Sequence, residues 1–244
     1  MISNHRNHLF SSQLLVSCRS FDVSYPGKNG FSYSTVPLKG DPNGQRGVMS
    51  TMAFNPDMSR TFAVGTFANC VGIYTEDVEC VLQINDLEFG VTHVKWSQCG
   101  NYLYVGGRKN DNILKWDVRN TREEVGRFSR TCGTNQKYSF DLDPWGKFLA
   151  TGNQEGQILV YDTTTFDIVK SSGVLGDCVN SVSFHPFSSI IFSCTGQRHF
   201  QLEEESSDDE EESKVLAAKK CFEYVGSGIQ VHKMGYNPLR RPEQ

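Results

Sequence analysis

The sequence predicts an all-β protein assembled from several small, similar sheets, and three observations lead to that prediction. A pattern of strands and turns recurs four times at a nearly constant step. Glycine is frequent, with 22 copies, and tight connections between strands favour glycine. Helical periodicity is almost absent, with Ser213–Cys221 as one short candidate for a turn of helix.

Each repeat opens with an alternating strand that ends in a turn. The four copies are Met49–Pro56, Val91–Ser97, Tyr138–Pro144 and Val179–Pro186. Equivalent positions are separated by 42, 46 and 42 residues, counted from Phe54 through Trp96 and Leu142 to Phe184. A period in the low forties is typical of the four-stranded blades of a propeller.

Two further strands follow in each copy. The second ends in small residues, at 62–66, 103–107, 148–152 and 191–195. The third closes on an aromatic residue, at 71–74, 113–117 and 158–162, and the fourth copy closes later, at Ile229–His232. We expect these aromatic side chains to fill the space between blades, namely Trp116, Tyr161, Tyr74 and, from a weaker upstream copy, Phe21.

The repeat therefore predicts a partial WD40-type β-propeller with about four complete blades plus one fragment. Stacked blades bury faces that a single small sheet leaves exposed. We expect the end of an upstream blade and a connecting strand in 1–46, four blades in 47–234 and a tail in 235–244. A closed ring of this type usually has about seven blades, so about half a ring is expected.

Composition indicates a soluble intracellular protein. No apolar run is long enough to cross a bilayer, and the first residues do not form a signal peptide. The eight cysteines form no C-x-x-C pair, so we interpret all of them as structural.

The charge is unevenly distributed. Glu203–Glu212 holds eight acids and no base, inside an insert expected at 202–213. The formal net charge is −4, but without this run 24 bases face 20 acids, a net of +4. A mildly basic body therefore carries one acidic segment.

No sequence signature of catalysis is present. The chain has no G-x-S-x-G elbow, H-E-x-x-H motif, phosphate-binding loop or dinucleotide fingerprint. His93 and His185 lie in first strands, where a hydrogen-bonded structural histidine is expected rather than a metal ligand. We therefore predict a protein that binds partners, with no catalysis, no cofactor and no metal.

Four sequence segments are more specific than the general pattern of the repeat. They are Gly107–Asp111 with the following strand, Thr134–Pro144, Asp177–Pro186 and Ser193–Phe200. In this order and spacing they resemble the telomerase Cajal body protein family, in which an acidic, serine-containing insert follows the last phrase. The resemblance covers about 46–200 and departs from the family at Ser97–Gly100, which replaces a His-Pro-Asp-Gly turn.

The resemblance implies a function in the nucleus. It implies binding of small Cajal-body RNAs, in vertebrates also of telomerase RNA, and delivery of their particles to Cajal bodies. Other proteins, including the folding chaperonin, would bind the propeller faces, and neither DNA nor a membrane is an expected partner. The alternative is a scaffold that binds only proteins, without direct contact to RNA.

Basic loop residues are the candidates for RNA contact. We predict that Arg108, Lys109, Lys137 and Arg198 bind phosphates, because cations track the backbone of single-stranded RNA. Gln136–Lys137 and Gln197–His199 are expected at places comparable to Arg108–Lys109 in the next two blades. The alternative is that these residues are ordinary solvated loop charges. The residues alone, without the family resemblance, favour this alternative.

The acidic run carries two candidate phosphorylation sites. Ser206 and Ser207 each have an acid three residues later, the pattern favoured by acidophilic kinases. Phosphate would add about −1.5 to −2 charges per site. We expect the run to form a loop that tunes binding, and the alternative is a solubilising spacer.

Overall fold

The computed structural model describes six ranges of the chain, and every regular element in them is a β-strand. The described ranges are 8–13, 17–22, 31–36, 44–77, 79–196 and 228–233. This confirms the predicted all-β class. No helix long and apolar enough to span a bilayer occurs in these ranges.

Three blades are complete antiparallel sheets of four strands in chain order. Blade 1 consists of β4 (Met49–Phe54), β5 (Thr61–Thr66), β6 (Cys70–Thr75) and β7 (Cys80–Ile84). Blade 2 consists of β8 (Val91–Trp96), β9 (Tyr102–Gly107), β10 (Asn112–Asp117) and β11 (Gly126–Ser129). Blade 3 consists of β12 (Phe140–Leu142), β13 (Phe148–Gly152), β14 (Ile158–Asp162) and β15 (Ile168–Ser171).

The fourth sheet has three strands in the described part of the chain, where four were predicted. Blade 4 consists of β16 (Val179–Phe184), β17 (Ile190–Thr195) and β18 (Gly228–Lys233). β18 pairs with β17 over six residues, so the predicted closing strand at Ile229–His232 is confirmed. The segment that joins these strands, with the acidic run, lies outside the described residues.

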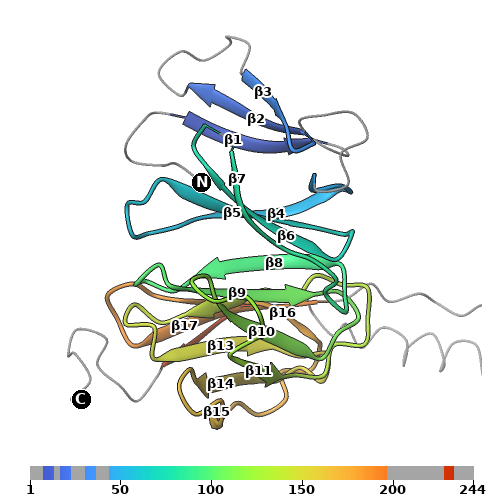
Figure 1. Cartoon of the computed structure of the whole chain (residues 1–244). Helices are drawn as coiled ribbons and strands as arrows, with labels where there is room; N and C mark the ends of the chain where they lie inside the picture. The colour runs from blue at the N-terminus through green and yellow to red at the C-terminus, as the bar shows by residue number, and fades with distance from the viewer. Residues whose placement is uncertain are drawn as a thin grey trace, which may run out of the picture.

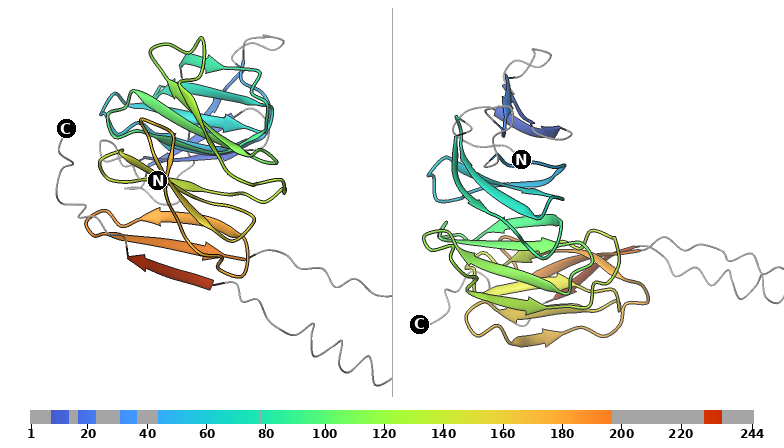
Figure 2. Two further views of the ribbon diagram at one scale, coloured as in Figure 1. Left: turned by 90° about the horizontal axis from the view of Figure 1, so that it is seen from below. Right: turned by 45° about the vertical axis from the view of Figure 1, so that its right-hand side comes forward.

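The N-terminal region contains three strands, where the end of an upstream blade and a connecting strand were predicted. β1 (His8–Gln13), β2 (Ser17–Asp22) and β3 (Phe31–Ser34) form a three-stranded sheet. It packs beside blade 1, because Cys18 belongs to the same buried cluster as Phe62 and Tyr74. In Figures 1 and 2 the five sheets follow one another along an arc that the described strands do not close.

The core lies between the blades, as the repeat predicted. One buried cluster joins blades 1 and 2, a second joins blades 2 and 3, and a third joins blades 3 and 4. Tyr74 and Tyr161 are almost fully buried, Trp116 is partly buried against the first cluster, and Phe21 is half-buried.

Seven of the eight cysteines lie in the described ranges, and all seven are free thiols. Cys18, Cys70, Cys132 and Cys178 are buried, and burial raises the pKa of the Cys132 thiol to about 11. These four cysteines therefore act as core side chains, which fits the structural interpretation. Cys221 lies outside the described residues.

Candidate nucleic-acid interface

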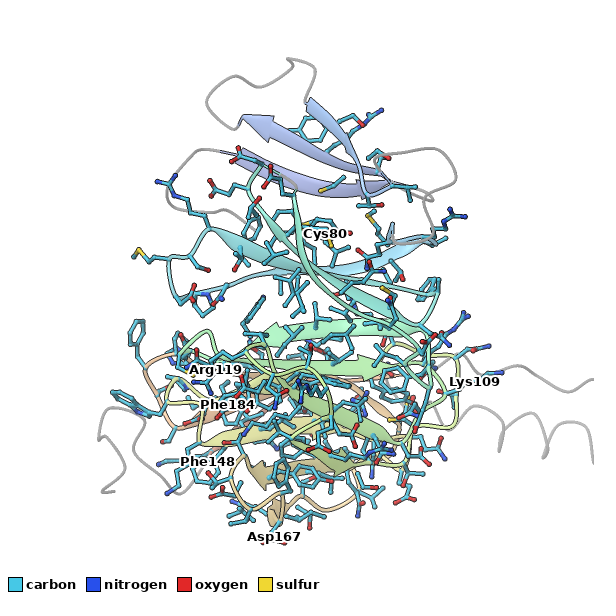
Figure 3. All side chains as sticks on the ribbon, viewed as in Figure 1. Cys80, Lys109, Arg119, Phe148, Asp167 and Phe184 are labelled. Atoms are coloured by element: carbon cyan, nitrogen blue, oxygen red, sulfur yellow. The ribbon has the colours of Figure 1, made fainter. Side chains whose placement is uncertain are left out.

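One end of the sheets carries the predicted basic residues. Because neighbouring strands are antiparallel, the turn after each second strand and the loop into the next blade lie at the same end. We call this end the loop face and define it by residues 67–69, 85–90, 108–111, 130–139, 153–157 and 172–178. In Figure 3 it is the right-hand side, where Lys109 is labelled, and Arg119 lies on the opposite side.

The turn with Arg108 and Lys109 is held by both neighbouring loops. The backbone N–H of Arg108 donates to the Gly90 carbonyl over 3.1 Å. That of Lys109 donates to the Thr134 carbonyl over 3.2 Å, in the loop that also carries Lys137. The structure therefore joins three of the four predicted RNA-binding residues through one turn and one loop, with all three side chains exposed.

Arg108 stacks on an aromatic ring that the sequence did not single out. Its guanidinium carbon lies 4.8 Å from the centroid of Phe67, in the corresponding turn of blade 1. Phe67 is 37% exposed. The pair presents a flat cationic surface, the type of group on which an unpaired base stacks.

A buried arginine supports the loop that carries Lys137. Arg130 is almost inaccessible, and its Nη1 donates to the Thr151 hydroxyl over 2.7 Å and to the Tyr138 carbonyl over 3.4 Å. Asp111 accepts a bond of 2.7 Å from the backbone N–H of Cys132. The loop is thus fixed to blade 3 and to the basic turn.

Lys137 does not occupy a position equivalent to Arg108–Lys109, and this corrects that part of the prediction. Arg108 and Lys109 follow a second strand, whereas Lys137 precedes a first strand. The turn of blade 3 that corresponds to Arg108–Lys109 carries Glu155 instead. In blades 1 to 3, which the structure describes in full, the patch is therefore formed by one turn and the adjacent loop.

Three predicted residues lie outside the described ranges, namely Arg198, Ser206 and Ser207. β17 ends at Thr195, and the backbone N–H of Gly196 donates to the Cys178 carbonyl on the loop face over 3.0 Å. The chain thus leaves blade 4 at the loop face, two residues before Arg198.

The innermost strands of the four blades line a groove of about 740 Å³. Lys137 lies on its wall with Lys95, and the lining also includes the hydroxyl groups of Ser139, Ser181 and Ser183. Asp141 contributes the one carboxylate among its lining residues. The groove thus combines two cations with one anion.

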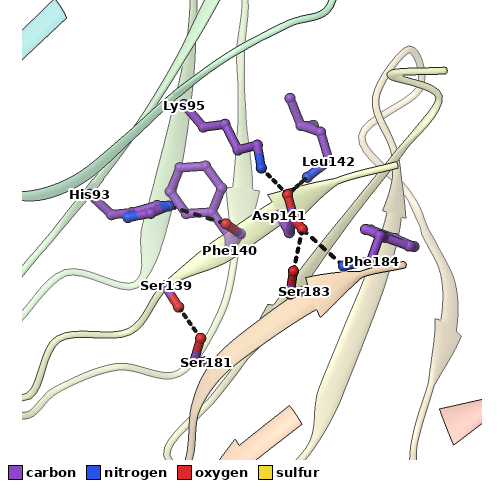
Figure 4. A network of polar contacts seen from close by, with 9 residues as sticks. All are labelled: His93, Lys95, Ser139, Phe140, Asp141, Leu142, Ser181, Ser183 and Phe184. Carbon is purple, nitrogen blue, oxygen red and sulfur yellow. Dashed lines mark hydrogen bonds and ion pairs between the residues drawn. The ribbon is translucent and has the colours of Figure 1, made fainter. Parts of the chain in front are cut away.

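Polar contacts cross this groove from blade to blade (Figure 4). Lys95 on β8 forms an ion pair with Asp141 on β12. The same carboxylate accepts bonds of 3.0 Å from the Ser183 hydroxyl and 2.8 Å from the Phe184 backbone N–H, both on β16. Ser139 and Ser181 are joined over 2.6 Å. These contacts connect the inner strands of blades 2, 3 and 4.

His93 is a structural residue of the groove wall. Its Nε2 lies 3.2 Å from the Phe140 carbonyl, and its ring meets the Phe140 ring edge-on at 4.7 Å. Burial, followed by the positive charges of Lys137 and Lys95, lowers the pKa of His93 to about 4. The imidazole is therefore neutral at pH 7. His185 accepts a bond from the Phe187 backbone N–H over 3.1 Å, so both predicted structural histidines are hydrogen-bonded.

The repeated four-stranded sheets, stacked with their first strands inward, define a β-propeller protein of the WD type. A sequence model of the family described as "Lactonase, 7-bladed beta-propeller" matches residues 74–192. This match agrees with the propeller fold of the chain. The lactonase activity in the description belongs to the matched family, and we do not transfer it to this chain.

Several relatives of the chain share one name. Telomerase Cajal body protein 1 of Bos taurus is 34% identical over 189 residues, 75% of this chain and 34% of that protein. The Homo sapiens protein of the same name is 33% identical over 189 residues, with the same coverage. The predicted resemblance is confirmed: over three quarters of its length, the chain is a homologue of the telomerase Cajal body proteins.

A differently named relative shares the same region. Guanine nucleotide-binding protein negative regulator 1 of Schizosaccharomyces pombe is 37% identical over 180 residues, 69% of this chain and 44% of that protein. The chain spans about a third of the length of the telomerase Cajal body proteins it matches.

Proposed function

We propose that the chain is a non-catalytic scaffold that binds small Cajal-body RNAs through the loop face and directs their particles to Cajal bodies in the nucleus. The observation that carries this proposal is the junction of the Arg108–Lys109 turn with the loop of Lys137. The relatives named for telomerase and the Cajal body support the nuclear destination in this proposal, and telomerase RNA is a second candidate ligand.

The chemistry of the loop face suits an unpaired RNA loop. Single-stranded RNA is held by cations at its phosphates and by planar groups against its bases. Arg108, Lys109 and Lys137 supply the cations, and the Arg108–Phe67 pair supplies a planar surface. Each phosphate neutralised on a single strand contributes a slope of about −0.7 to the dependence of log affinity on log salt.

The test measures binding of a fluorescently labelled RNA stem-loop at several salt concentrations. The variant reverses charge at Arg108, Lys109, Lys137 and Arg198, each changed to Glu. We expect weaker binding and a salt slope shallower by about 2 to 3, because several phosphate contacts are lost. The matched control reverses Arg119 and Arg122, which lie in a loop at the opposite end of blade 2. Equal affinity and slope in the fourfold variant would contradict the proposal.

The second candidate function is a scaffold that binds proteins without contacting RNA. The relative named as a negative regulator of a guanine nucleotide-binding protein favours it, because that name refers to a protein partner. RNA crosslinking in cells separates the two functions. Recovery of small Cajal-body RNAs attached to the chain supports the first, and their absence together with recovered protein partners supports the second.

A further inference from the structure

Four polar side chains lie together at the loop-face end of the groove, and we call them the mouth cluster. They are His93 on β8, Lys137 and Ser139 just before β12, and Ser181 on β16. Ser139 is bonded to Ser181, and the carbonyl of the next residue, Phe140, is bonded to His93 (Figure 4). Three blades thus bring an ammonium, an imidazole and two hydroxyl groups to one entrance.

Lys137 carries a charge that no described residue neutralises. The other lysine of the groove, Lys95, forms its ion pair with Asp141, the one carboxylate among the lining residues. Lys137 is exposed and forms no ion pair within the described ranges. The groove therefore has one positive charge in excess, and this charge belongs to the mouth cluster.

A second uncompensated cation lies behind the cluster. Arg130 is buried, and the two groups that accept its hydrogen bonds, the Thr151 hydroxyl and the Tyr138 carbonyl, are neutral. Its Nε and Nη2 have no acceptor among the described residues. A buried charge without a counter-ion is costly, and its field acts over a longer range than in water. Arg130 therefore adds to the positive potential at the entrance.

Ser181 has a hydrogen to donate to a ligand. The Ser139 hydroxyl donates to the Ser181 hydroxyl over 2.6 Å. Each hydroxyl group has one hydrogen, and that of Ser181 has no acceptor among the described residues. The pair is therefore a short chain of hydrogen bonds whose free donor is at Ser181.

The imidazole of His93 can become a third donor. Its Nε2 lies 3.2 Å from a backbone carbonyl, which can only accept. In the neutral ring Nε2 therefore carries the hydrogen, and Nδ1 carries none. An anion bound at the entrance favours the protonated ring, in which Nδ1 also donates.

The charges around His93 explain why it is neutral without such an anion. Burial and the positive charges of Lys137, Lys95 and Arg130 hold the pKa of His93 at about 4. Asp141 on β12 is paired with Lys95, and β4, which packs on β8, contains no titratable residue. The ring thus faces cations that an incoming anion would offset.

This set of donors suits a phosphate. A phosphate carries negative charge and several acceptor oxygens, so an ammonium, a hydroxyl and a protonated imidazole can each bind a different oxygen. The groove of about 740 Å³ is in the size range of ligand sites. Lys137 also belongs to the loop face, where the proposed RNA strand supplies phosphates.

We propose that the mouth cluster binds one phosphate of the RNA strand and takes up one proton from solvent as it does so. Lys137 pairs with the phosphate, and the Ser181 hydroxyl donates to it. Nδ1 of His93 receives the proton and donates it to the same phosphate. The proposal rests on the RNA-binding function proposed above, and it adds a site at which the strand enters the groove.

The first test measures binding of the labelled RNA stem-loop to the full chain at pH 7.5 and pH 5.5, at constant salt. We expect affinity to rise at pH 5.5 by several-fold, up to about tenfold, because the complex holds a proton that the free protein lacks. The sign follows from the free pKa of about 4, which the phosphate raises toward the usual 6.5. His93→Gln can still donate to the Phe140 carbonyl but takes up no proton, so it should lose this increase.

Two further variants test the other donors. Ser181→Ala is expected to weaken RNA binding about tenfold at pH 5.5, because a hydrogen bond to a charged group is lost, while the salt slope stays the same. Lys137→Met should make the slope shallower by about 0.7 and reduce the pH dependence. Ser183→Ala is the matched control, since this hydroxyl lines the same groove but is bonded to Asp141. It should bind RNA like the natural chain.

A change in the RNA makes the test independent of protein folding. A neutral methylphosphonate replaces each phosphate of the RNA loop in turn. We expect one position to abolish the rise in affinity at pH 5.5. The same substitution should cost less affinity in Ser181→Ala than in the natural chain, because the lost hydrogen bond is already absent there.

Three results would overturn the proposal while salt-dependent RNA binding through Arg108 and Lys109 persists. These are an equal rise in affinity for His93→Gln, unchanged binding by Ser181→Ala, and a methylphosphonate series in which no position removes the pH dependence. Absence of RNA binding at both pH values would overturn the proposed function as well. Inorganic phosphate that binds with this pH dependence while RNA does not would assign the cluster to a free phosphate compound.

Discussion

Asp141 connects the inner strands of three consecutive blades through one carboxylate. It forms an ion pair with Lys95 of blade 2 and accepts two hydrogen bonds from blade 4. Asp141 itself is buried, while the side chain of Lys95 is 39% exposed. The Leu142 backbone N–H also donates to this carboxylate over 2.8 Å. The interaction therefore derives its strength mainly from the buried acceptor and its four donors, and less from the attraction between charges.

Asp141→Ala is expected to lower the free energy of unfolding by about 2–4 kcal/mol, because it leaves the Phe184 N–H and the Lys95 ammonium without this acceptor. Urea denaturation measures the change. Asp167→Ala is the control, since Asp167 is exposed, and its effect should stay within about 0.5 kcal/mol. Equal stability of both variants would show that the blades align without this carboxylate.

Trp116→Ala is expected to lower the free energy of unfolding by about 3 kcal/mol, because it removes a ring packed between blades 1 and 2. The indole Nε1 is buried and has no acceptor among the described residues. Trp116→Phe removes that donor but keeps an aromatic ring, so it should cost clearly less. Thermal melting of both variants measures these losses of stability. An unchanged melting temperature for Trp116→Ala would disprove the packing role.

Phe67→Ala separates stacking from charge on the loop face. We expect it to weaken RNA binding by about 1–3 kcal/mol without changing the salt slope, because a base–aromatic contact involves no phosphate. Arg108→Gln should instead make the slope shallower. Titration of the labelled stem-loop at three salt concentrations tests both. A changed slope in Phe67→Ala would mean that the ring acts only by orienting Arg108.

His93 is expected to make stability depend on pH. Its pKa is about 4 in the folded protein, below the usual 6.5, so the unfolded chain takes up a proton that the folded protein does not. Its contribution to stability is thus full above pH 6.5 and is lost progressively toward pH 4. Between pH 7.5 and 5 we expect a loss of about 1–2 kcal/mol that His93→Gln lacks. Parallel pH profiles for the two proteins would contradict this.

Deletion of Glu203–Glu212 tests the predicted role of the acidic run. The melting temperature is expected to stay constant, since β17 and β18 keep their six paired residues. RNA affinity should increase, because eight negative charges between those strands are removed. Ser206→Glu with Ser207→Glu should decrease it. Unchanged RNA and protein binding in all variants would leave the run as a spacer, and a large loss of thermal stability would contradict the loop interpretation.

The class of fold and the family resemblance could both be predicted without coordinates. Alternation within strands and a period near 42 residues depend on chain-local geometry, so Phe54, Trp96, Leu142 and Phe184 could be aligned without coordinates. The closing strand of blade 4 was also predicted correctly, because the pattern at Ile229–His232 survives a long insertion. The basic residues at 108, 109 and 137 were identifiable as loop positions for the same reason.

Which of these residues lie in contact could not be predicted from local patterns, because it depends on how the blades stack. Arg108 and Phe67 are 41 positions apart, and no local pattern indicates that one covers the other. Asp141 and Ser183 are likewise 42 positions apart and meet only because blades 3 and 4 pack side by side. Packing between blades joins residues about one repeat apart, and that relation is fixed by how sheets stack rather than by neighbours in the chain.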